Sequence, residues 1–165
     1  MYTILICDDD RDIVSALDIY LTSEGYRTIA AYNGREAIQA AEENEIHLIL
    51  MDVMMPELDG IKTLLKVRES KNLPIILLSA KSEDADKILG LTAGADDYIT
   101  KPFRINELLS RMRSVQRRYH RQEEDIVQIQ YLSIYPKQGK VYREQEEVLL
   151  TALEYRLLMV FINHP

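Results

Sequence analysis

The sequence predicts an α/β fold in which five parallel strands form a doubly wound sheet, followed by a small antiparallel sheet and one helix. Strand and helix patterns alternate from the first residue to about Arg118, and repeated βα units of this length favour a parallel sheet. Three short apolar runs, at residues 4–7, 48–51 and 98–100, end at charged residues, which is typical of buried parallel strands. The crossovers should be right-handed, and we expect the strand order 2-1-3-4-5.

Strands and helices alternate at short spacing in the first part of the chain. The first three strands are predicted at residues 2–7, 26–31 and 46–51. The helix after the first strand has apolar residues at helical spacing, and Gly25 is its expected C-cap. Asn33 begins the next helix, which runs to about Glu43, and Glu36 stands where a reciprocal capping partner is expected.

The remaining elements of the sheet follow the same pattern. The last two strands are predicted at residues 74–78 and 97–100, and their helices at about 61–70, 82–94 and 104–119. Pro56 and Asp59-Gly60 mark a loop after the third strand. Ser82 is the expected cap of the fourth helix, because the acidic residues after it suit the positive end of the helix dipole.

Composition divides the chain into three parts. We expect a domain at residues 1–120, a linker at residues 121–126 and a smaller, incomplete domain at residues 127–165. Mixed charge after Arg117 indicates a helix that passes into a linker. Short alternating stretches, broken by Pro136 and Gly139, predict the antiparallel sheet. Thr151 and Glu154 form a capping box, which predicts the start of the last helix.

Charge and composition exclude several functions. A net charge of −7 argues against nucleic-acid binding by the chain as a whole. The single cysteine, Cys7, excludes an internal disulfide and is expected to be a small buried hydrophobe. No apolar run approaches the roughly 20 residues of a membrane-spanning helix, and the first residues lack the features of a signal peptide. We therefore expect a cytoplasmic protein without membrane contact.

Charged residues that follow the first, third and fifth strands are expected to meet. The carboxyl ends of parallel strands open onto one edge, where ligands bind, so Asp8, Asp9, Asp52 and Lys101 should share a crevice. Crowded carboxylates repel, so a proton or a cation must compensate them. Mg²⁺ fits best, because it needs few protein oxygens and keeps waters for a phosphoryl group. Asp9 and Asp52 are the expected direct ligands, Asp8 acts through water, and the Met54 carbonyl is a further oxygen.

This crevice has the composition of a phosphoryl-transfer site. A lysine and a magnesium ion together stabilise phosphoryl oxygens, which makes Asp52 the candidate nucleophile. Ser79 ends the fourth strand, and its hydroxyl can donate to the new phosphoryl group. Taken singly, these residues have ordinary explanations: acids after strands often cap helices, as we expect of Asp10, and Asp59 suits a turn. Their shared location is what favours the functional interpretation.

Together these residues resemble the receiver domain of two-component response regulators, over residues 1 to about 120. The resemblance rests on Asp8-Asp9, on residues 51–60 around Asp52, on Ser79-Ala80 and on residues 94–103, which are similar to the OmpR/PhoB class. It implies a flavodoxin-like fold and a sensor histidine kinase that phosphorylates Asp52, with Mg²⁺ held by Asp8 and Asp9. It also implies a signalling protein that catalyses only its own phosphorylation and dephosphorylation and is not otherwise an enzyme.

The resemblance further implies a switch and a homodimer. Tyr98 matches the switch aromatic that responds together with Ser79, and the Lys101-Pro102 bond is expected to be cis. The fourth helix, fifth strand and fifth helix form the dimer face in this class. Charges of alternating sign on that face predict pairs between two copies: Lys87 with Glu107, Asp97 with Arg111, and Asp96 with Arg118.

Residues 127–165 resemble the start of a winged-helix DNA-binding domain, comprising its N-terminal sheet and first helix. The motif runs from Leu150-Thr151 through Leu157-Leu158 to Asn163-His164-Pro165. In helix-turn-helix proteins the second helix carries the base contacts, and in this family it would follow Pro165. We therefore expect DNA binding only from a longer parent protein, in which phosphorylation controls transcription.

Two other functions share some of these features. A magnesium-dependent phosphatase of the haloacid-dehalogenase type also has an aspartyl nucleophile. In that family, however, the nucleophile belongs to an Asp-x-Asp motif after the first strand. Here the candidate nucleophile follows the third strand, and Met54 occupies the position two residues later. No second acid is therefore placed to protonate a leaving group. An inert receiver-like interaction module is disfavoured, because every position needed for the chemistry is filled.

Overall fold

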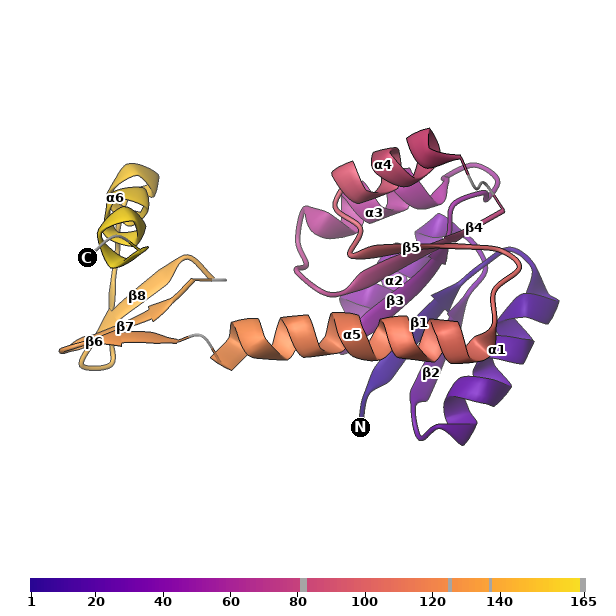
Figure 1. The fold of residues 1–165 in the computed structure, drawn as a ribbon, viewed down its shortest axis with the longest axis horizontal. Helices are drawn as coiled ribbons and strands as arrows, with labels where there is room; N and C mark the ends of the chain where they lie inside the picture. Colours follow the sequence, from indigo (N-terminus) through magenta and orange to yellow (C-terminus); the bar gives the residue numbers. More distant parts are fainter. Residues whose placement is uncertain (81–82, 125, 137, 164–165) are drawn as a thin grey trace. The chain divides into compact units, whose positions relative to one another are not determined.

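The computed structural model describes residues 1–80, 83–124, 126–136 and 138–163, which form two compact units (Figure 1). The first unit is Met1–Gln116 and the second is Arg117–Pro165. The first unit contains a five-stranded parallel sheet in the order β2-β1-β3-β4-β5, which confirms the predicted order. None of the helices in the described residues combines the length and the hydrophobicity that crossing a bilayer requires.

The elements of the sheet lie within a few residues of their predicted positions. The strands are β1 (Thr3–Cys7), β2 (Arg27–Ala31), β3 (Leu48–Asp52), β4 (Ile75–Ser79) and β5 (Asp97–Thr100). The helices are α1 (Arg11–Ser23), α2 (Gly34–Glu43), α3 (Gly60–Arg68), α4 (Asp84–Thr92) and α5 (Ile105–Glu124). The parallel register brings the carboxyl ends of β1, β3 and β4 to one edge of the sheet.

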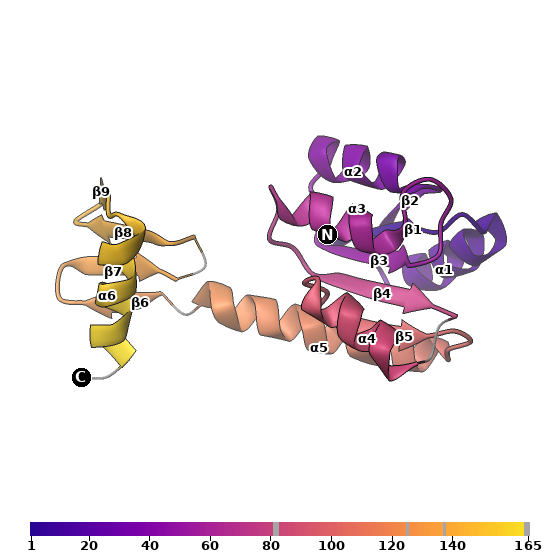
Figure 2. The ribbon, with the colours of Figure 1, turned by 90° about the horizontal axis from the view of Figure 1, so that it is seen from above.

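Both faces of the sheet are buried, which explains the continuous apolar runs in β1, β3 and β4. Successive strand residues point to opposite faces. Leu5, Ile49 and Leu77 belong to the core cluster that also contains Leu64 and Val67 of α3. The helices α2 and α3 cover this face, and α1 and α5 cover the other (Figure 2).

Acidic and amide side chains cap three of the helices. Asp10 accepts a hydrogen bond from the backbone N–H of Asp12 (2.9 Å), and it caps α1 as predicted. Asn33 accepts from the N–H of Glu36 (2.8 Å), while the Glu36 carboxylate accepts from Tyr32 N–H and thus reaches one residue further back than predicted. Asp59 was expected only to form a turn, and it also caps α3. The expected cap of the fourth helix, at position 82, lies outside the described residues.

The second unit contains an antiparallel sheet and a helix. Its strands are β6 (Val127–Ile129), β7 (Leu132–Tyr135), β8 (Lys140–Arg143) and β9 (Glu146–Val148), and its helix is α6 (Ala152–Asn163). Thr151 and Glu154 form the predicted capping box, with reciprocal hydrogen bonds of 2.7 and 3.3 Å. The helix α5 continues to Glu124, five residues beyond its predicted end, so residues 121–124 of the predicted linker are helical. The domain boundaries themselves stay a prediction.

Two adjacent leucines of α3 test how the core supports the sheet. Leu64 is fully buried, whereas Leu65 is half exposed. Replacing Leu64 by alanine should lower the free energy of unfolding by about 2–5 kcal/mol, because it leaves a cavity in the core. Leu65→Ala should cost less than about 1 kcal/mol. Urea unfolding with an unchanged slope measures both values, and equal losses from the two variants would contradict this packing.

Candidate functional site

Lys101 lies between two buried carboxylates at the carboxyl edge of the sheet. Its Nζ atom is 2.7 Å from Asp8 Oδ2 and 3.2 Å from Asp52 Oδ1. Asp8 follows β1, Asp52 ends β3, and Lys101 follows β5, so three strands position the group. Both carboxylates are almost fully buried. The structure therefore brings together charges that are up to 93 residues apart in the sequence.

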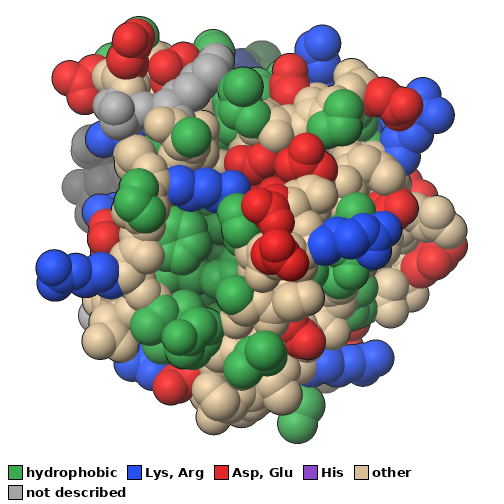
Figure 3. All heavy atoms as spheres, turned by 90° about the vertical axis from the view of Figure 1, so that its right-hand side faces the viewer, with side chains coloured by type: hydrophobic (Ala, Val, Ile, Leu, Met, Phe, Trp, Pro, Cys, Tyr) green, Lys and Arg blue, Asp and Glu red, His purple; other side chains and the backbone are tan. Residues whose placement is uncertain are grey.

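A third carboxylate completes the acidic cluster. Asp8, Asp9 and Asp52 each place an oxygen within 4.8 Å of the others, and Asp9 is exposed. The second oxygen of Asp8 accepts a hydrogen bond from Asp10 N–H (2.9 Å), so the start of α1 holds this carboxylate in place. Acidic side chains gather at the centre of the face that shows this edge (Figure 3).

Burial and neighbouring charges act in opposite directions on the ionisation of these groups. Burial raises the pKa of Asp52, the Asp8 charge raises it further, and Lys101 lowers it. Burial by itself would lower the pKa of Lys101, but Asp8 and Asp52 outweigh this effect and raise it. Lys101 is therefore held in its charged form by the carboxylates that it neutralises.

The neighbouring thiol is not a reactive group. Burial, together with the charge of Asp8, raises the pKa of Cys7 to about 12. The sulfur atom lies 3.6 Å from the sulfur of Met55. Because the thiolate is the reactive form of cysteine, Cys7 acts as a buried hydrophobic residue, as the sequence predicts.

The donor set suits a hard divalent cation. Mg²⁺ prefers carboxylate oxygens and keeps part of its water shell. The three clustered carboxylates supply such oxygens, and the exposed position of Asp9 leaves the cluster open to solvent. The acidic cluster is thus consistent with Mg²⁺ binding. The proposed contribution of the Met54 carbonyl stays a prediction.

Ser79 and Tyr98 lie on β4 and β5, the two strands that follow β3 in the sheet. Ser79 ends β4 and is fully buried, and its carbonyl accepts a hydrogen bond of 2.7 Å from Lys101 N–H. Tyr98 on β5 is 6% exposed and lines a cavity of about 520 Å³ together with Asp9 and Met54. The Lys101-Pro102 bond is cis, as the resemblance implies. The switch roles of Ser79 and Tyr98 stay predictions.

Charges expected to pair between two copies also pair within one chain. Arg111 contacts Asp97 at 3.0 Å and Glu107 at 3.3 Å. The pKa of Arg111 is raised, mainly because its guanidinium group donates hydrogen bonds to Asp97. The proposed dimer roles of these residues, and of Lys87 and Arg118, stay predictions.

Asp96 has an internal role that the sequence did not reveal. Its carboxylate contacts Arg68 at 2.9 Å and accepts a hydrogen bond of 2.8 Å from Ile75 N–H. Arg68 also donates to the carbonyl of Gly94. Asp96 thus ties α3 to the starts of β4 and β5, and its expected pairing with Arg118 of a second copy stays a prediction.

Gly60 is a site residue that sequence reasoning missed. A Cβ atom at this position would lie 2.2 Å from the carbonyl oxygen of Asp52, and the N–H of Gly60 donates to the carbonyl of Val53 (2.9 Å). The glycine therefore lets α3 begin directly against the backbone of Asp52. The sequence signalled only a turn at Asp59-Gly60, because a close approach between backbones has no sequence signal of its own.

A hydrophobic hollow adjoins Lys101. It has a volume of about 590 Å³, and its lining includes Ile13, Leu17, Tyr20, Pro102, Phe103 and Ile105. Part of this lining belongs to α1, part is Lys101 and the residues after it, and Ala80 follows β4. Hydrophobic side chains surround a hollow beside the acidic residues in Figure 3. The hollow thus offers apolar contact area next to the charged cluster.

A doubly wound sheet with carboxylates and a lysine at its switch point is the arrangement of a flavodoxin-like receiver domain. The chain belongs to the response regulators, since the family described as the response regulator receiver domain matches residues 4–113. Response regulators are signalling proteins and not classical enzymes.

Named relatives and a solved structure agree with this assignment. The chain is 40% identical to the response regulator GtcR of Aneurinibacillus migulanus over 98% of its own length and 70% of GtcR. It is 39% identical to the transcriptional regulatory protein SrrA of Staphylococcus aureus, with the same coverage. The solved structure of the response regulator TrrA of Thermotoga maritima, in complex with Mg²⁺ and BeF, is similar to this chain with a TM-score of 0.64 and 33% identity. The similarity covers 70% of this chain and 99% of TrrA.

Removing the lysine tests how strongly the acidic pocket depends on it. Lys101→Met should lower the free energy of unfolding in magnesium-free buffer by about 3–5 kcal/mol, because it leaves buried carboxylates without a counter-charge. Adding Asp52→Asn should restore part of this loss, since it removes one of the charges. Lys66→Met, which breaks an exposed pair with Glu69, is the control and should cost less than about 1 kcal/mol.

Urea unfolding measures all four proteins. A Lys101→Met loss no larger than that of Lys66→Met would show that the pocket does not need the lysine charge.

Proposed function

We propose that Asp52 accepts a phosphoryl group from a phosphohistidine of a sensor histidine kinase, and that the phosphorylated chain controls transcription. The observation that carries this proposal is the position of Lys101 Nζ against both Asp8 and Asp52, with Asp9 beside them. A carboxylate in this position is suited to nucleophilic attack on a phosphoryl group. The lysine beside it is suited to stabilise the negative charge of the phosphoryl oxygens. The relatives named as response and transcriptional regulators support the same function.

In the proposed reaction an oxygen of Asp52 attacks the phosphorus atom. A P–O bond forms while the P–N bond to histidine breaks, and the histidine nitrogen keeps the electron pair and takes up a proton. Lys101 moves from the carboxylate of Asp52 to the transferred oxygens, where its charge balances theirs. Ser79, buried at the end of β4, donates a hydrogen bond to the phosphoryl group.

Asp8, Asp9 and Asp52 would hold Mg²⁺, with the Met54 carbonyl as a further ligand. The bound ion would neutralise part of the charge on the phosphoryl oxygens. Asp9 is the exposed member of the cluster and so the accessible ligand, whereas Asp8 is also held by Asp10 N–H and Lys101. TrrA, a similar structure, contains Mg²⁺ and a BeF group, which supports this choice of metal.

The hydrophobic hollow beside Lys101 suits contact with the kinase. A donor histidine must approach Asp52 from the carboxyl edge of the sheet, and the hollow lies at that edge. Apolar contact there would hold the partner while the phosphoryl group is transferred.

Phosphorylation would act on a second surface through Ser79 and Tyr98. The residues of α4, β5 and α5 are the proposed homodimer face, as in the OmpR/PhoB class. A single exposed ion pair contributes little to the stability of a dimer. The predicted pairs, such as Lys87 with Glu107, would therefore set the register of the dimer. The second unit would begin a winged-helix effector, and DNA recognition would need the helix that the family places after residue 165.

Intact-mass measurement with acetyl phosphate and Mg²⁺ tests the proposed chemistry. The protein should gain one phosphoryl group, because acetyl phosphate can replace the kinase as donor. Asp52→Asn should gain none, and Asp12→Asn, an exposed acid in the first turn of α1, should behave as wild type. Sustained phosphate release with turnover would instead support a phosphatase, and an unchanged mass would support an inert module.

A thermal-shift titration tests the magnesium site. Mg²⁺ at ten times its dissociation constant should stabilise the protein by about 1.4 kcal/mol, because it binds only the folded state. The melting temperature should then rise by a few degrees. Asp9→Asn should abolish most of this rise, whereas Asp12→Asn should retain it. An equal rise in the Asp9→Asn protein would exclude Asp9 as a ligand.

A further inference from the structure

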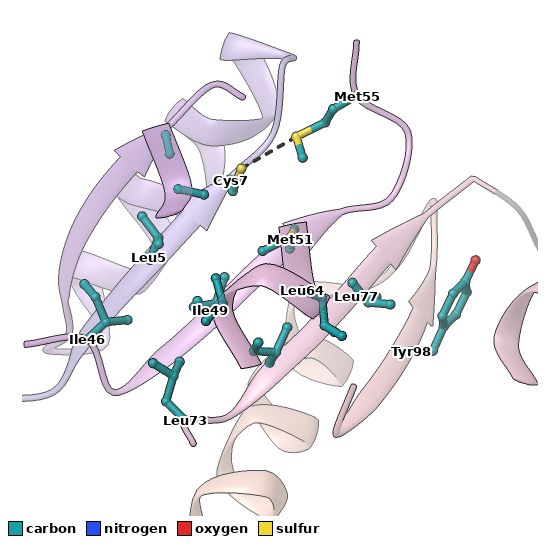
Figure 4. Packing of buried hydrophobic residues seen from close by; sticks show 14 residues of the cluster. Leu5, Cys7, Ile46, Ile49, Met51, Met55, Leu64, Leu73, Leu77 and Tyr98 are labelled. Carbon is teal, nitrogen blue, oxygen red and sulfur yellow. Dashed lines mark hydrogen bonds between the residues drawn. The ribbon is translucent and has the colours of Figure 1, made fainter. Parts of the chain in front are cut away.

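Gly90 leaves the space in which the ring of Tyr98 packs. A Cβ atom at position 90 would lie 2.8 Å from Leu77 Cδ1 and 3.0 and 3.3 Å from Tyr98 Cδ2 and Cε2. Leu77 and Tyr98 are register partners on β4 and β5, and their side chains lie on the same face of the sheet (Figure 4). A side chain at position 90 and the ring of Tyr98 would therefore compete for the same volume.

The helix α4 has a glycine where helix propensity disfavours one. Glycine loses more backbone entropy on folding than alanine does, so it destabilises a helix interior. Gly90 is nevertheless the one buried residue of α4. Its backbone is in ordinary helical conformation, so no unusual dihedral angle requires glycine here. What requires it is the close approach of the Leu77 side chain and of the Tyr98 ring.

Neither neighbour can yield easily to a side chain at position 90. Leu77 is fully buried within the core cluster, where close packing leaves little room. The ring of Tyr98 is rigid, so relieving contacts at both Cδ2 and Cε2 requires the whole ring to swing about its χ1 bond. The ring also lines the cavity that contains Asp9 and Met54, so such a movement would change the wall of the acidic site.

We propose that Gly90 is a positioning residue for Tyr98. Because position 90 has no side chain, the ring can occupy its buried position between α4 and the acidic site. The proposal deepens the proposed function, because the response of Tyr98 to phosphorylation of Asp52 rests on it. A side chain at position 90 displaces the ring toward solvent. The Tyr98 ring then no longer links the surface formed by α4 and β5 to the acidic site. Asp52 can still accept a phosphoryl group.

Fluorine NMR of protein labelled with 3-fluorotyrosine tests the position of the ring. The chain has 10 tyrosines, and Tyr98→Phe identifies the signal of Tyr98 by its loss. In wild type this signal should show almost no shift between H₂O and D₂O, because the ring is buried. In Gly90→Ala it should show the shift of an exposed tyrosine. Thr92→Ala, an exposed position on the same helix, should match wild type. An unchanged solvent shift in Gly90→Ala overturns the proposal.

Stability gives a second test whose sign decides the outcome. Helix propensity alone predicts that Gly90→Ala raises the urea midpoint, whereas competition with the ring predicts that it lowers it. In a Leu77→Val background, which removes the other close contact, the substitution should still lower the midpoint. When Tyr98→Val is added to that background the ring is absent as well, so the same substitution should raise the midpoint. This reversal of sign is a direct coupling between positions 90 and 98. The same sign in both backgrounds overturns the proposal.

Acetyl phosphate separates this inference from the proposed function. Wild type and Gly90→Ala should both gain one phosphoryl group by intact mass. The Tyr98 signal should then move on phosphorylation in wild type and stay in place in Gly90→Ala. A wild type that gains no phosphoryl group contradicts the proposed function, whereas the solvent shift and the midpoints still decide the role of Gly90. An equal movement of the signal in both phosphorylated proteins overturns the proposal.

Discussion

The charge balance around Lys101 is the constraint on which the site depends. Asp8 and Asp52 are almost fully buried, and carboxylates so placed are costly unless a cation accompanies them. Lys101 supplies that cation and stays charged because of them. If the lysine instead pairs with another anion, Asp8 and Asp52 lose their counter-charge and the pocket becomes strongly negative. A divalent cation and a phosphoryl group are a combination that satisfies both the carboxylates and the lysine.

The sheet supplies the rigidity that this balance needs. Asp8, Asp52 and Lys101 stand at the ends of three strands whose register is fixed by burial on both faces. Loops by themselves would not hold charged groups at such distances against their desolvation cost. Gly60 adds to this precision, because it allows α3 to begin against the backbone of Asp52. The chemistry therefore rests on groups that the core holds in place.

The cavity beside the acidic cluster joins the chemistry to the surface of α4 and β5. Its lining includes Asp9 and Met54 as well as Leu89 of α4 and Tyr98 of β5. The acidic cluster and α4 thus border one shared space. Ion pairs within the chain, such as that of Arg111 with Asp97, already order the charged residues of β5 and α5.

The sequence by itself determined the parallel sheet and the meeting of Asp8, Asp9, Asp52 and Lys101. Those features follow from local periodicity and from the rule that ligands bind at the carboxyl ends of parallel strands. The capping residues Asp10 and Asn33 were predictable for the same reason, since a cap acts on its own helix turn.

Only the tertiary structure decided which side chains meet across elements. The pairing of Asp96 with Arg68, the approach of Gly60 to Asp52 and the space that Gly90 leaves for Tyr98 join residues that share no local pattern. The extension of α5 to Glu124 through a polar segment was likewise missed, because mixed charge marks both linkers and solvated helices. Close packing between distant segments depends on the assembled shape of the fold, which hydrophobic periodicity does not encode.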